Sequence, residues 1–416
     1  MHVVMLGLHA EPVQALTSSG HQITVLYEPW ERERAGTVLE QVARSHLVET
    51  YADLDALLLA LEEVGVRPGG VDAVVTLKEF AVVPAALLGA VLGARALDPD
   101  VALRCRDKAL QKAAWRRAGI PTANWAVVPD VQGHPEAAAE AVRARGMAPP
   151  FIVKPLASAG TVGVRAVNDE TSLPEAVRDI LRERPTTRRL LVEERNEGDE
   201  WHFDGLIRHG SVEAVLVSRY LAPLIETKNG HPTATASFPP GAEPELYAEA
   251  RHFAADALRA LGLTDCVFHL EVFGGPGRFV AGELAARPGG GWIQTLVGKV
   301  LGIDIWAAAV RAATGEETEI PEPADRAFGY THLPPMAGCL SRLVPSDIAS
   351  IPGVVDVLLR IPAGAVMPDM AHSSRVKLGM ALVEAEDHET CEAVLREVID
   401  TVVRINGGPH HEKGRS

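Results

Sequence analysis

Glu271 and Glu283 stand in two short apolar segments, HLEVF and RFVAGEL, which are joined by Gly-Gly-Pro-Gly. This pattern predicts a β-hairpin with one acidic side chain on each strand. A buried carboxylate is costly unless it is paired or binds a cation. Arg287 and the glycines from Gly289 to Gly291 follow the second strand. Carboxylates suit Mg²⁺ and arginine neutralises phosphoryl oxygens, so the segment indicates a magnesium and phosphate site, with a hairpin whose acids face water as the alternative.

A second segment with phosphate chemistry lies upstream, where the predicted strand FIVKP is followed by a small-residue loop and the predicted strand VGVRAV. Lys154 on the first strand supplies a point charge for phosphate. Small residues let backbone N–H groups approach phosphate oxygens, and hydroxyl groups add donors. The loop lacks the order of a Walker A motif, and an ordinary hairpin loop is the alternative. Its candidate residues are Ser158, Gly160, Thr161 and Gly163.

Further charged residues lie on the elements around these two segments. Lys108 is near the start of a basic amphipathic helix predicted from Arg104 to Gly119, where taken alone it reads as a surface charge. The segments LLVEE, EWHFDGLI and VEAVLVS predict an antiparallel sheet that carries Glu193, Glu194 and Glu200. Residues 219–244, rich in Pro, Thr and Ala, are predicted to form a long loop of the kind that serves as a lid.

The first 98 residues alternate predicted strands and helices, which indicates a doubly wound α/β unit. Its first turn, from Gly7 to Glu11, lacks the G-x-G-x-x-G pattern, so an NAD site there rests on fold analogy alone. Glu79 follows the strand VDAVVTL, at the place where ligands gather in such units; a solvated acid is the alternative. Residues 321–405 read as a compact α+β lobe, and the tail after it is predicted to be disordered.

Length and composition exclude several classes of protein. The chain has 416 residues, enough for two or three packed units, and 47% of them are hydrophobic. A formal net charge of −15 argues against a nucleic-acid-binding surface. The four cysteines are far apart and form no C-x-x-C pair, so they suggest neither a zinc site nor a disulfide framework. Without a basic leader or a long apolar run, we expect a cytoplasmic protein with no membrane partner.

Taken in order, these pieces resemble the ATP-grasp superfamily of carboxylate ligases, and their pattern is most similar to the bacterial L-amino acid ligases. The resemblance covers about residues 1–320 and rests on order and spacing rather than on one motif: the R-D-K helix, FIVKP with its loop, LVEE followed by E-G-D-E, and E-x-x-x-R-P-G-G. It implies an ATP-grasp fold of the α/β and α+β class. The parts would be an N-terminal α/β domain (1–98), linker helices and a mobile ATP lid subdomain (99–196), an antiparallel catalytic subdomain (197–320), a C-terminal α+β lobe (321–405) and a tail (406–416).

The resemblance also implies ATP and Mg²⁺, with Mn²⁺ as a substitute, and a role for each matching residue. Glu271 and Glu283 would bind the metal, and Arg287 would stabilise the transferring phosphoryl group. The remaining contacts to ATP would be as follows: Lys108, Lys154 and the loop from Ser158 to Gly163 on the phosphates, Glu193 on the adenine amino group, the backbone of Glu194, Arg195 and Asn196 on the adenine edge, and Glu200 on the ribose. Many relatives carry Asn where this chain has Ala285, which puts affinity for a second metal in doubt.

The family chemistry implies a small carboxylate, such as an amino acid, that is phosphorylated by ATP and then attacked by an amine. A carboxylase or formate-using ligase on the same fold, and a nucleotide-binding protein without ligase activity, are the alternatives. Glu79, His269 and Arg375 are candidate substrate contacts; Arg375 and Lys377 could hold a substrate carboxylate or form a solvated strand edge. The oligomeric state stays open, with a homodimer through the apolar helix at 82–93 as one alternative.

Overall fold

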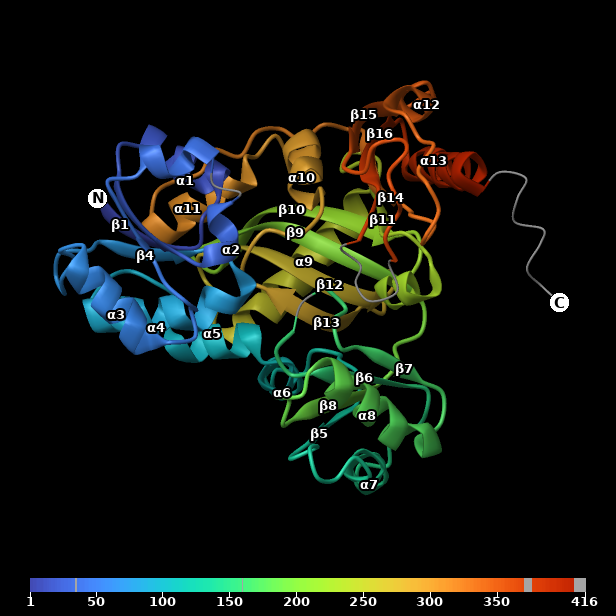
Figure 1. The fold of residues 1–416 in the computed structure, drawn as a ribbon, viewed down its shortest axis with the longest axis horizontal. Coiled ribbons are helices and arrows are strands. Elements are labelled where there is room, and N and C mark those ends of the chain that lie inside the picture. Colours follow the sequence, from blue (N-terminus) through green and yellow to red (C-terminus); the bar gives the residue numbers. More distant parts are fainter. Residues whose placement is uncertain (34–35, 159, 370–375, 408–416) are drawn as a thin grey trace.

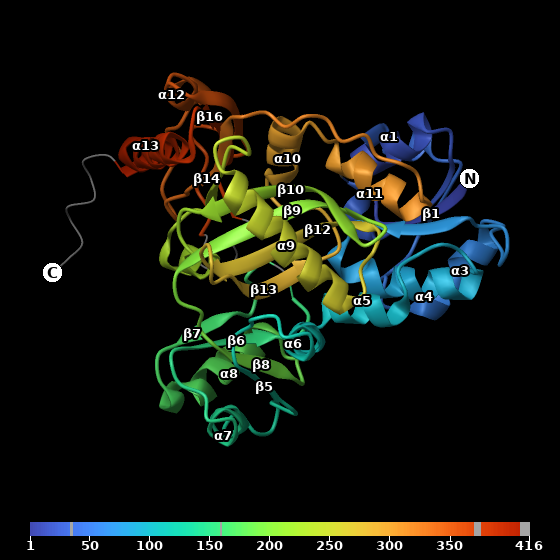
Figure 2. The ribbon, with the colours of Figure 1, turned by 180° about the vertical axis from the view of Figure 1, so that it is seen from behind.

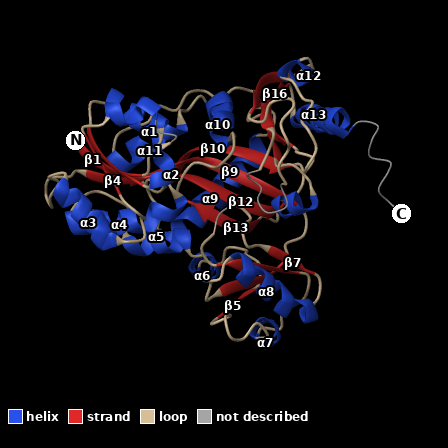
Figure 3. Cartoon of the chain, viewed as in Figure 1, coloured by secondary structure: helices blue, strands red, loops and turns tan. Residues whose placement is uncertain are grey.

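The structure is a computed structural model that describes residues 1–33, 36–158, 160–369 and 376–407 (Figure 1). Three β-sheets with packed helices make up the fold (Figure 3). One sheet is parallel and two are antiparallel, so the predicted α/β and α+β class is confirmed. The last helix, α13 (His388–Gly407), extends into the segment predicted as a tail, whose remaining residues lie outside the described part of the chain.

The N-terminal unit is a four-stranded parallel sheet in the order β3-β2-β1-β4. Its elements are β1 (His2–Leu6), α1 (Ala10–Ser18), β2 (Gln22–Tyr27), α2 (Pro29–Arg32), β3 (Arg44–Leu47), α3 (Leu54–Glu63), β4 (Ala73–Thr76) and α4 (Val82–Leu92). Strand β1 is a continuous apolar run because both faces of a parallel sheet are buried. Val4 and Leu6 pack with α3 and α4, whereas Val3 and Met5 pack with α1 on the opposite face. This two-sided packing confirms the predicted doubly wound unit.

A second, antiparallel sheet in the order β5-β8-β6-β7 lies below the rest of the molecule in Figure 1. Residues 99–194 begin with α5 (Pro99–Arg106), which packs against α4, and α6 (Lys108–Arg117). They continue with β5 (Trp125–Val128), α7 (Ala137–Ala144), β6 (Phe151–Pro155), β7 (Arg165–Val167), α8 (Leu173–Glu183) and β8 (Leu190–Glu194), which form this sheet and its helices. The prediction of a single helix from Arg104 to Gly119 is wrong, because α5 ends at Arg106 and α6 begins at Lys108. Asp107 adopts an extended conformation and accepts the N–H groups of Ala109 and Leu110, so it ends α5 and caps α6.

The largest sheet has eight strands in the order β13-β12-β9-β10-β11-β14-β16-β15. Its strands are β9 (Asp199–Arg208), β10 (Ser211–Tyr220), β11 (Ala234–Ser237), β12 (Cys266–Gly274), β13 (Val280–Ala285), β14 (Ala327–Leu333), β15 (Val354–Leu359) and β16 (Gly379–Ala385). Its helices are α9 (Pro244–Leu261), α10 (Ile293–Leu301), α11 (Ile305–Thr314), α12 (Pro345–Ala349) and α13. The strands of the predicted C-terminal lobe therefore continue the sheet of residues 199–285.

Residues 219–244 do not form the single long loop that their composition predicts. They include β11, whose four residues are buried and which pairs with β10 on one side and β14 on the other. A strand this short gives little periodic signal, and its formation depends on partners that lie far along the chain. The strand closes the sheet between the segments before residue 220 and those after residue 327.

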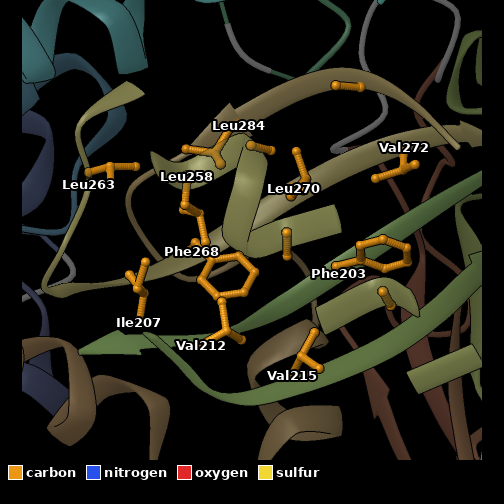
Figure 4. Close-up of a cluster of buried hydrophobic side chains, with 14 of the residues drawn as sticks. Phe203, Ile207, Val212, Val215, Leu258, Leu263, Phe268, Leu270, Val272 and Leu284 are labelled. Carbon is orange, nitrogen blue, oxygen red and sulfur yellow. The ribbon is translucent and has the colours of Figure 1, made fainter. Parts of the chain in front are cut away.

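The two faces of the large sheet differ, as alternation along the strands requires. On one face α9 crosses the strands, as the reverse view shows (Figure 2). Apolar side chains of α9 and the sheet form the core there, including Phe203, Phe268, Leu270 and Leu258 (Figure 4). Burying each such side chain contributes about 1.5–3 kcal/mol. The other face packs against α10 along part of its length and otherwise carries the polar residues of β9 and β12.

Among the described residues, no single helix has both the length and the apolar composition to cross a membrane. Helices α10 and α11 reach both only when they are counted together, and they meet at an angle of 89°. Val310 of α11 packs into the core of the N-terminal unit, and α11 lies beside α1 in Figure 1.

Candidate active site

A cavity of about 1570 Å³ is lined by residues from the N-terminal unit, the second sheet and the large sheet. Most of the residues predicted from the sequence line it: Glu79, Lys108, Lys154, Ser158, Gly160, Thr161, Glu193, Arg195, Asn196, Glu200, His269, Glu271, Glu283 and Arg287. Its volume exceeds the roughly 300–1,000 Å³ of a typical ligand pocket, so it has room for more than one small molecule. Arg375 lies outside the described residues.

Two of the described candidates, Gly163 and Glu194, lie outside this lining. Gly163 has a φ of +73°, and a Cβ there would approach Pro155 and Arg184 to 3.1 and 3.3 Å, so glycine is needed for packing. The Glu194 carboxylate accepts hydrogen bonds from Asn124 Nδ2 at 2.9 Å and Ala148 N at 2.8 Å. Both residues hold the chain beside the cavity rather than facing into it.

Glu193 at the end of β8 forms ion pairs with two lysines. Its Oε2 lies 2.9 Å from Lys112 Nζ of α6, and its Oε1 contacts Lys154 Nζ of β6. Burial alone would raise the pKa of Glu193, but the charges of Lys112 and Lys154 lower it to about 2. Burial lowers the pKa of Lys112, whereas Glu193 and Glu283 together raise that of Lys154 against the effect of burial. Lys154 is therefore a fixed cation at the cavity wall.

Lys112 was not a candidate from the sequence, although a signal was present. Lys108 and Lys112 are four residues apart, which places them on one face of α6. Lys112 is 1% exposed and also contacts Thr122 Oγ1 at 3.1 Å and the Gly282 carbonyl oxygen at 3.3 Å. A buried lysine with this many partners anchors the helix.

The two glutamates of the predicted hairpin are direct partners across β12 and β13. Their side chains are 24% and 29% exposed, into the cavity. Lys108 Nζ donates to Glu283 Oε1 at 2.7 Å and to the Ser158 carbonyl oxygen at 3.3 Å. Burial would raise the pKa of Glu283, but Lys108 and Lys154 lower it. Two carboxylates beside open space fit a hard cation that takes its other ligands from water and phosphate.

Arg287 lies between this carboxylate pair and the N-terminal unit. Its Nε donates to Glu79 Oε2 at 2.5 Å, and its Nη1 donates to the Pro288 carbonyl oxygen at 2.8 Å. Arg106 Nη1 is 3.3 Å from Glu79 Oε1 and 3.3 Å from the Ser158 carbonyl oxygen. Glu79 lines the cavity as expected, and both of its carboxylate oxygens contact arginines.

Glu200 opens β9 and is buried at the wall of the cavity. Its Oε2 accepts the N–H of Leu224 at 2.8 Å. Burial and the neighbouring charge of Glu271 raise the pKa of Glu200 to about 8. A carboxyl group in this state binds hydroxyl groups as donor or acceptor, which suits a sugar.

Asp204, which the sequence did not single out, lies between two histidines. His202 Nδ1 is 2.5 Å from Asp204 Oδ2, and His269 Nδ1 is 2.8 Å from Asp204 Oδ1. Burial would raise the pKa of Asp204, but His269 and His202 lower it below its ordinary value. Burial would lower the pKa of His269, but Asp204 and then Glu271 raise it to about 10. The alternation in E-W-H-F-D predicts that His202 and Asp204 lie on the same face of β9. It does not predict that Asp204 lies opposite His269 of β12.

Comparisons with known proteins agree with this geometry. Residues 147–296 match the family model for the ATP-grasp domain. The L-arginine-specific L-amino acid ligase of Bacillus subtilis is 24% identical over 335 residues, which cover 79% of each chain. The crystal structure of the L-amino acid ligase from Bacillus licheniformis superposes with a TM-score of 0.74, at 20% identity over 96% of this chain and 97% of that one.

A third similar protein carries a different enzyme name. The carboxyaminoimidazole ribonucleotide synthase from Aspergillus clavatus, in complex with ATP, has a TM-score of 0.69 at 17% identity, over 97% of this chain and 98% of that one. The two structural likenesses establish the ATP-grasp fold, and the domain match covers Lys154, Glu193, Glu271, Glu283 and Arg287. Residues 147–296 form an ATP-grasp domain, and the comparisons identify the chain as an ATP-dependent ligase.

Proposed function

We propose that this ligase joins the carboxylate of an amino acid to an amine through an acyl phosphate and releases ADP and phosphate. The observation that carries the proposal is one cavity in which cations from three parts of the chain meet two carboxylates paired across a hairpin: Lys108, Lys154, Arg287, Glu271 and Glu283. Phosphoryl transfer depends mainly on positioning and charge stabilisation, which such a set supplies. The likeness to two L-amino acid ligases supports an amino acid as substrate.

In this proposal Lys108 and Lys154 bind the phosphates of ATP, beside the loop that contains Ser158, Gly160 and Thr161. Glu200 binds the ribose, and the backbone at Arg195 and Asn196 holds the adenine edge. Glu193 already pairs with Lys112 and Lys154, so its first effect on ATP is to hold Lys154 in place. An adenine amino group would share its oxygens with these lysines. The volume of the cavity supports binding of a second small molecule beside the nucleotide.

Glu271 and Glu283 would hold Mg²⁺, or Mn²⁺ in its place. When bound, the ion would neutralise charge on the phosphates and help to orient them. The side chain of Ala285 offers no ligand atom, so water and phosphate oxygens would complete the shell. Lys108, which lies 2.7 Å from Glu283, adds a further positive charge close to the same carboxylate.

Arg287 would stabilise the charge that develops on the phosphoryl group and on the tetrahedral intermediate. Glu79 fixes the guanidinium group of Arg287 through Oε2 and contacts Arg106 through Oε1. Both oxygens that a substrate amine would need are therefore already paired with arginines. Within the described part of the cavity, we assign Lys377 to the carboxylate group of the substrate. It lines the cavity, and its Nζ lies 2.9 Å from His332 Nε2.

The test is release of ADP and phosphate from Mg-ATP with the twenty amino acids, singly and in pairs, with mass spectrometry of the products. We expect ADP release and a dipeptide mass for at least one pair. Glu283→Gln should nearly abolish turnover, whereas Glu245→Gln, the same change at an exposed position on α9, should leave it unchanged.

Other outcomes would contradict parts of the proposal. ADP release that requires bicarbonate or formate in place of an amine would support a carboxylase or formate-using ligase, as the likeness to carboxyaminoimidazole ribonucleotide synthase allows. Full turnover by Glu283→Gln would overturn the metal assignment. Absence of ADP release with every pair would contradict amino acids as the substrates.

A further inference from the structure

Asp204 joins two histidines in a buried chain of polar contacts that ends at the cavity. His202 is 0% exposed, Asp204 2% and His269 8%, and of the three only His269 lines the cavity. The contacts run from Thr235 Oγ1 through His202, Asp204 and His269 to Glu271. Buried polar groups on a sheet face are costly unless each has a partner, so the arrangement is specific to this set of residues.

The direction of these hydrogen bonds follows from the number of protons available. Thr235 Oγ1 donates its single proton to the Arg219 carbonyl oxygen at 3.0 Å. It must therefore accept from His202 Nε2, which lies 2.7 Å away. Each oxygen of Asp204 contacts Nδ1 of one histidine. Both rings are thus fixed in orientation by the same carboxylate.

The three side chains are close enough to suggest a metal site, but their distances fit hydrogen bonds better. The nitrogen and oxygen atoms of each pair are 2.5 and 2.8 Å apart. Ligands at about 2.0–2.2 Å from a zinc ion in tetrahedral geometry would be separated by more than 3 Å. No room is left for an ion between Asp204 and either ring, so the cluster acts through hydrogen bonds.

The register of the sheet brings this cluster next to the predicted metal ligand. Asp204 is the cross-strand partner of His269, and His202 is the partner of Glu271. His269 Nε2 lies 3.6 Å from Glu271 Oε1, an ion-pair distance. The loop after Arg287 passes close to Asp204, because a Cβ on Gly289 would come within 2.8 Å of Asp204 Oδ1.

We propose that Asp204 and His202 are positioning residues that hold the His269 ring against Glu271, so that one carboxylate oxygen of Glu271 is fixed and the other is free for a metal ion. This inference rests on the proposed role of Glu271. Histidines and carboxylates that orient a metal ligand typically contribute 10- to 100-fold to metal affinity or activity.

The test measures the affinity of the nucleotide-free enzyme for Mn²⁺, with the free ion detected by electron paramagnetic resonance. Thermal unfolding of each variant shows whether it is folded. Glu271→Gln is the reference for loss of a ligand. Asp204→Asn and His269→Asn should each weaken Mn²⁺ binding about 10- to 100-fold. An Asn at 269 can still donate to Asp204 in place of Nδ1 but cannot reach Glu271, so it isolates the contact with Glu271.

Ser218→Ala is the matched control. Ser218 is the cross-strand partner of His202, it is 0% exposed, and its Oγ has no hydrogen-bond partner in the described chain. The Ser218→Ala variant should bind Mn²⁺ with the same affinity as the unmodified protein. If Asp204→Asn does not fold, His269→Asn decides the question.

Wild-type affinity in the Asp204 and His269 variants, with loss in Glu271→Gln, would overturn the positioning role and leave the metal assignment intact. Tighter binding in these variants would overturn it too, since it would mean that the charge of the cluster opposes the ion. Unchanged affinity in Glu271→Gln would overturn the metal assignment itself and the inference with it.

Discussion

Lys112 and Lys154 contact the same carboxylate, that of Glu193, but from different sides. Lys154 lines the cavity, whereas Lys112 lies beneath it, 1% exposed, with Thr122 and Gly282 as further partners. Replacing each lysine by methionine keeps an unbranched side chain, one atom shorter, and removes its charge. The two variants should therefore separate the contribution of this ion pair to stability from its contribution to catalysis.

Lys112→Met should lower stability while nearly preserving turnover. Removing one partner of a buried ion pair costs about 3–5 kcal/mol. Lys154 still neutralises Glu193, so we expect the lower end, about 3 kcal/mol. For a folding unit of 150–250 residues that is a decrease in Tm of roughly 6–12 °C. At temperatures well below the transition, ADP release should stay within a few fold of the wild type.

Lys154→Met should lower both quantities. It removes a comparable partner of Glu193 and also the charge that faces the phosphates. Loss of one preorganised stabilising group in an active site typically lowers kcat by about 10²–10³. Lys299→Met, at an exposed position on α10, is the control that should change neither quantity.

The assays are thermal unfolding by circular dichroism and ADP release at saturating Mg-ATP, each on the three variants and the wild type. Equal losses of turnover in Lys112→Met and Lys154→Met, at a temperature where both are folded, would contradict a purely structural role for Lys112. Unfolding of Lys112→Met at the wild-type temperature would contradict the stabilising effect of its ion pair with Glu193.

Two further predictions concern Glu193 and Glu79. Because the pKa of Glu193 is lowered from 4.5 to about 2 in the folded state, it should contribute about 3 kcal/mol above pH 4.5 that is lost as the pH falls toward 2. Urea unfolding between pH 5 and 3 should show a smaller pH dependence for Glu193→Gln; equal slopes would contradict the shift. Glu79→Gln weakens the charged hydrogen bond to Arg287, worth about 1.5–3 kcal/mol, so kcat should fall roughly 10- to 150-fold with the KM for ATP nearly unchanged. Equal changes in kcat and in ATP binding would argue against a role through Arg287.

Local patterns in the sequence predicted the parts of the site that depend on neighbouring residues. The hairpin with Glu271 and Glu283 could be predicted because a short turn fixes which strands pair, and period-two alternation fixes which face each residue occupies. Lys154 could be placed on a strand for the same reason. The roles assigned to these residues stay predictions that the experiments above would test.

Contacts between distant segments could not be predicted in this way. The contacts of His202 and His269 with Asp204 could not be predicted, because Asp204 meets His269 only through the register between β9 and β12. A slip of one residue would have turned every side chain to the other face, and nothing in either strand alone fixes the register. Strand β11 was missed because its pairing depends on β14, which lies about 90 residues further along the chain.

Helix α6 explains why a short basic segment matters to the whole site. Lys112 pairs with Glu193 on the second sheet, and one turn earlier Lys108 pairs with Glu283 on the large sheet. The two ion pairs therefore connect the predicted phosphate-binding sheet to the predicted metal-binding sheet through one rigid helix. Asp107 fixes where this helix begins, and so it sets the position of both lysines. A change in the distance between the two sheets has to break one of these ion pairs or move α6. If nucleotide binding shifts the second sheet, α6 would therefore transmit the shift to the carboxylates of the large sheet.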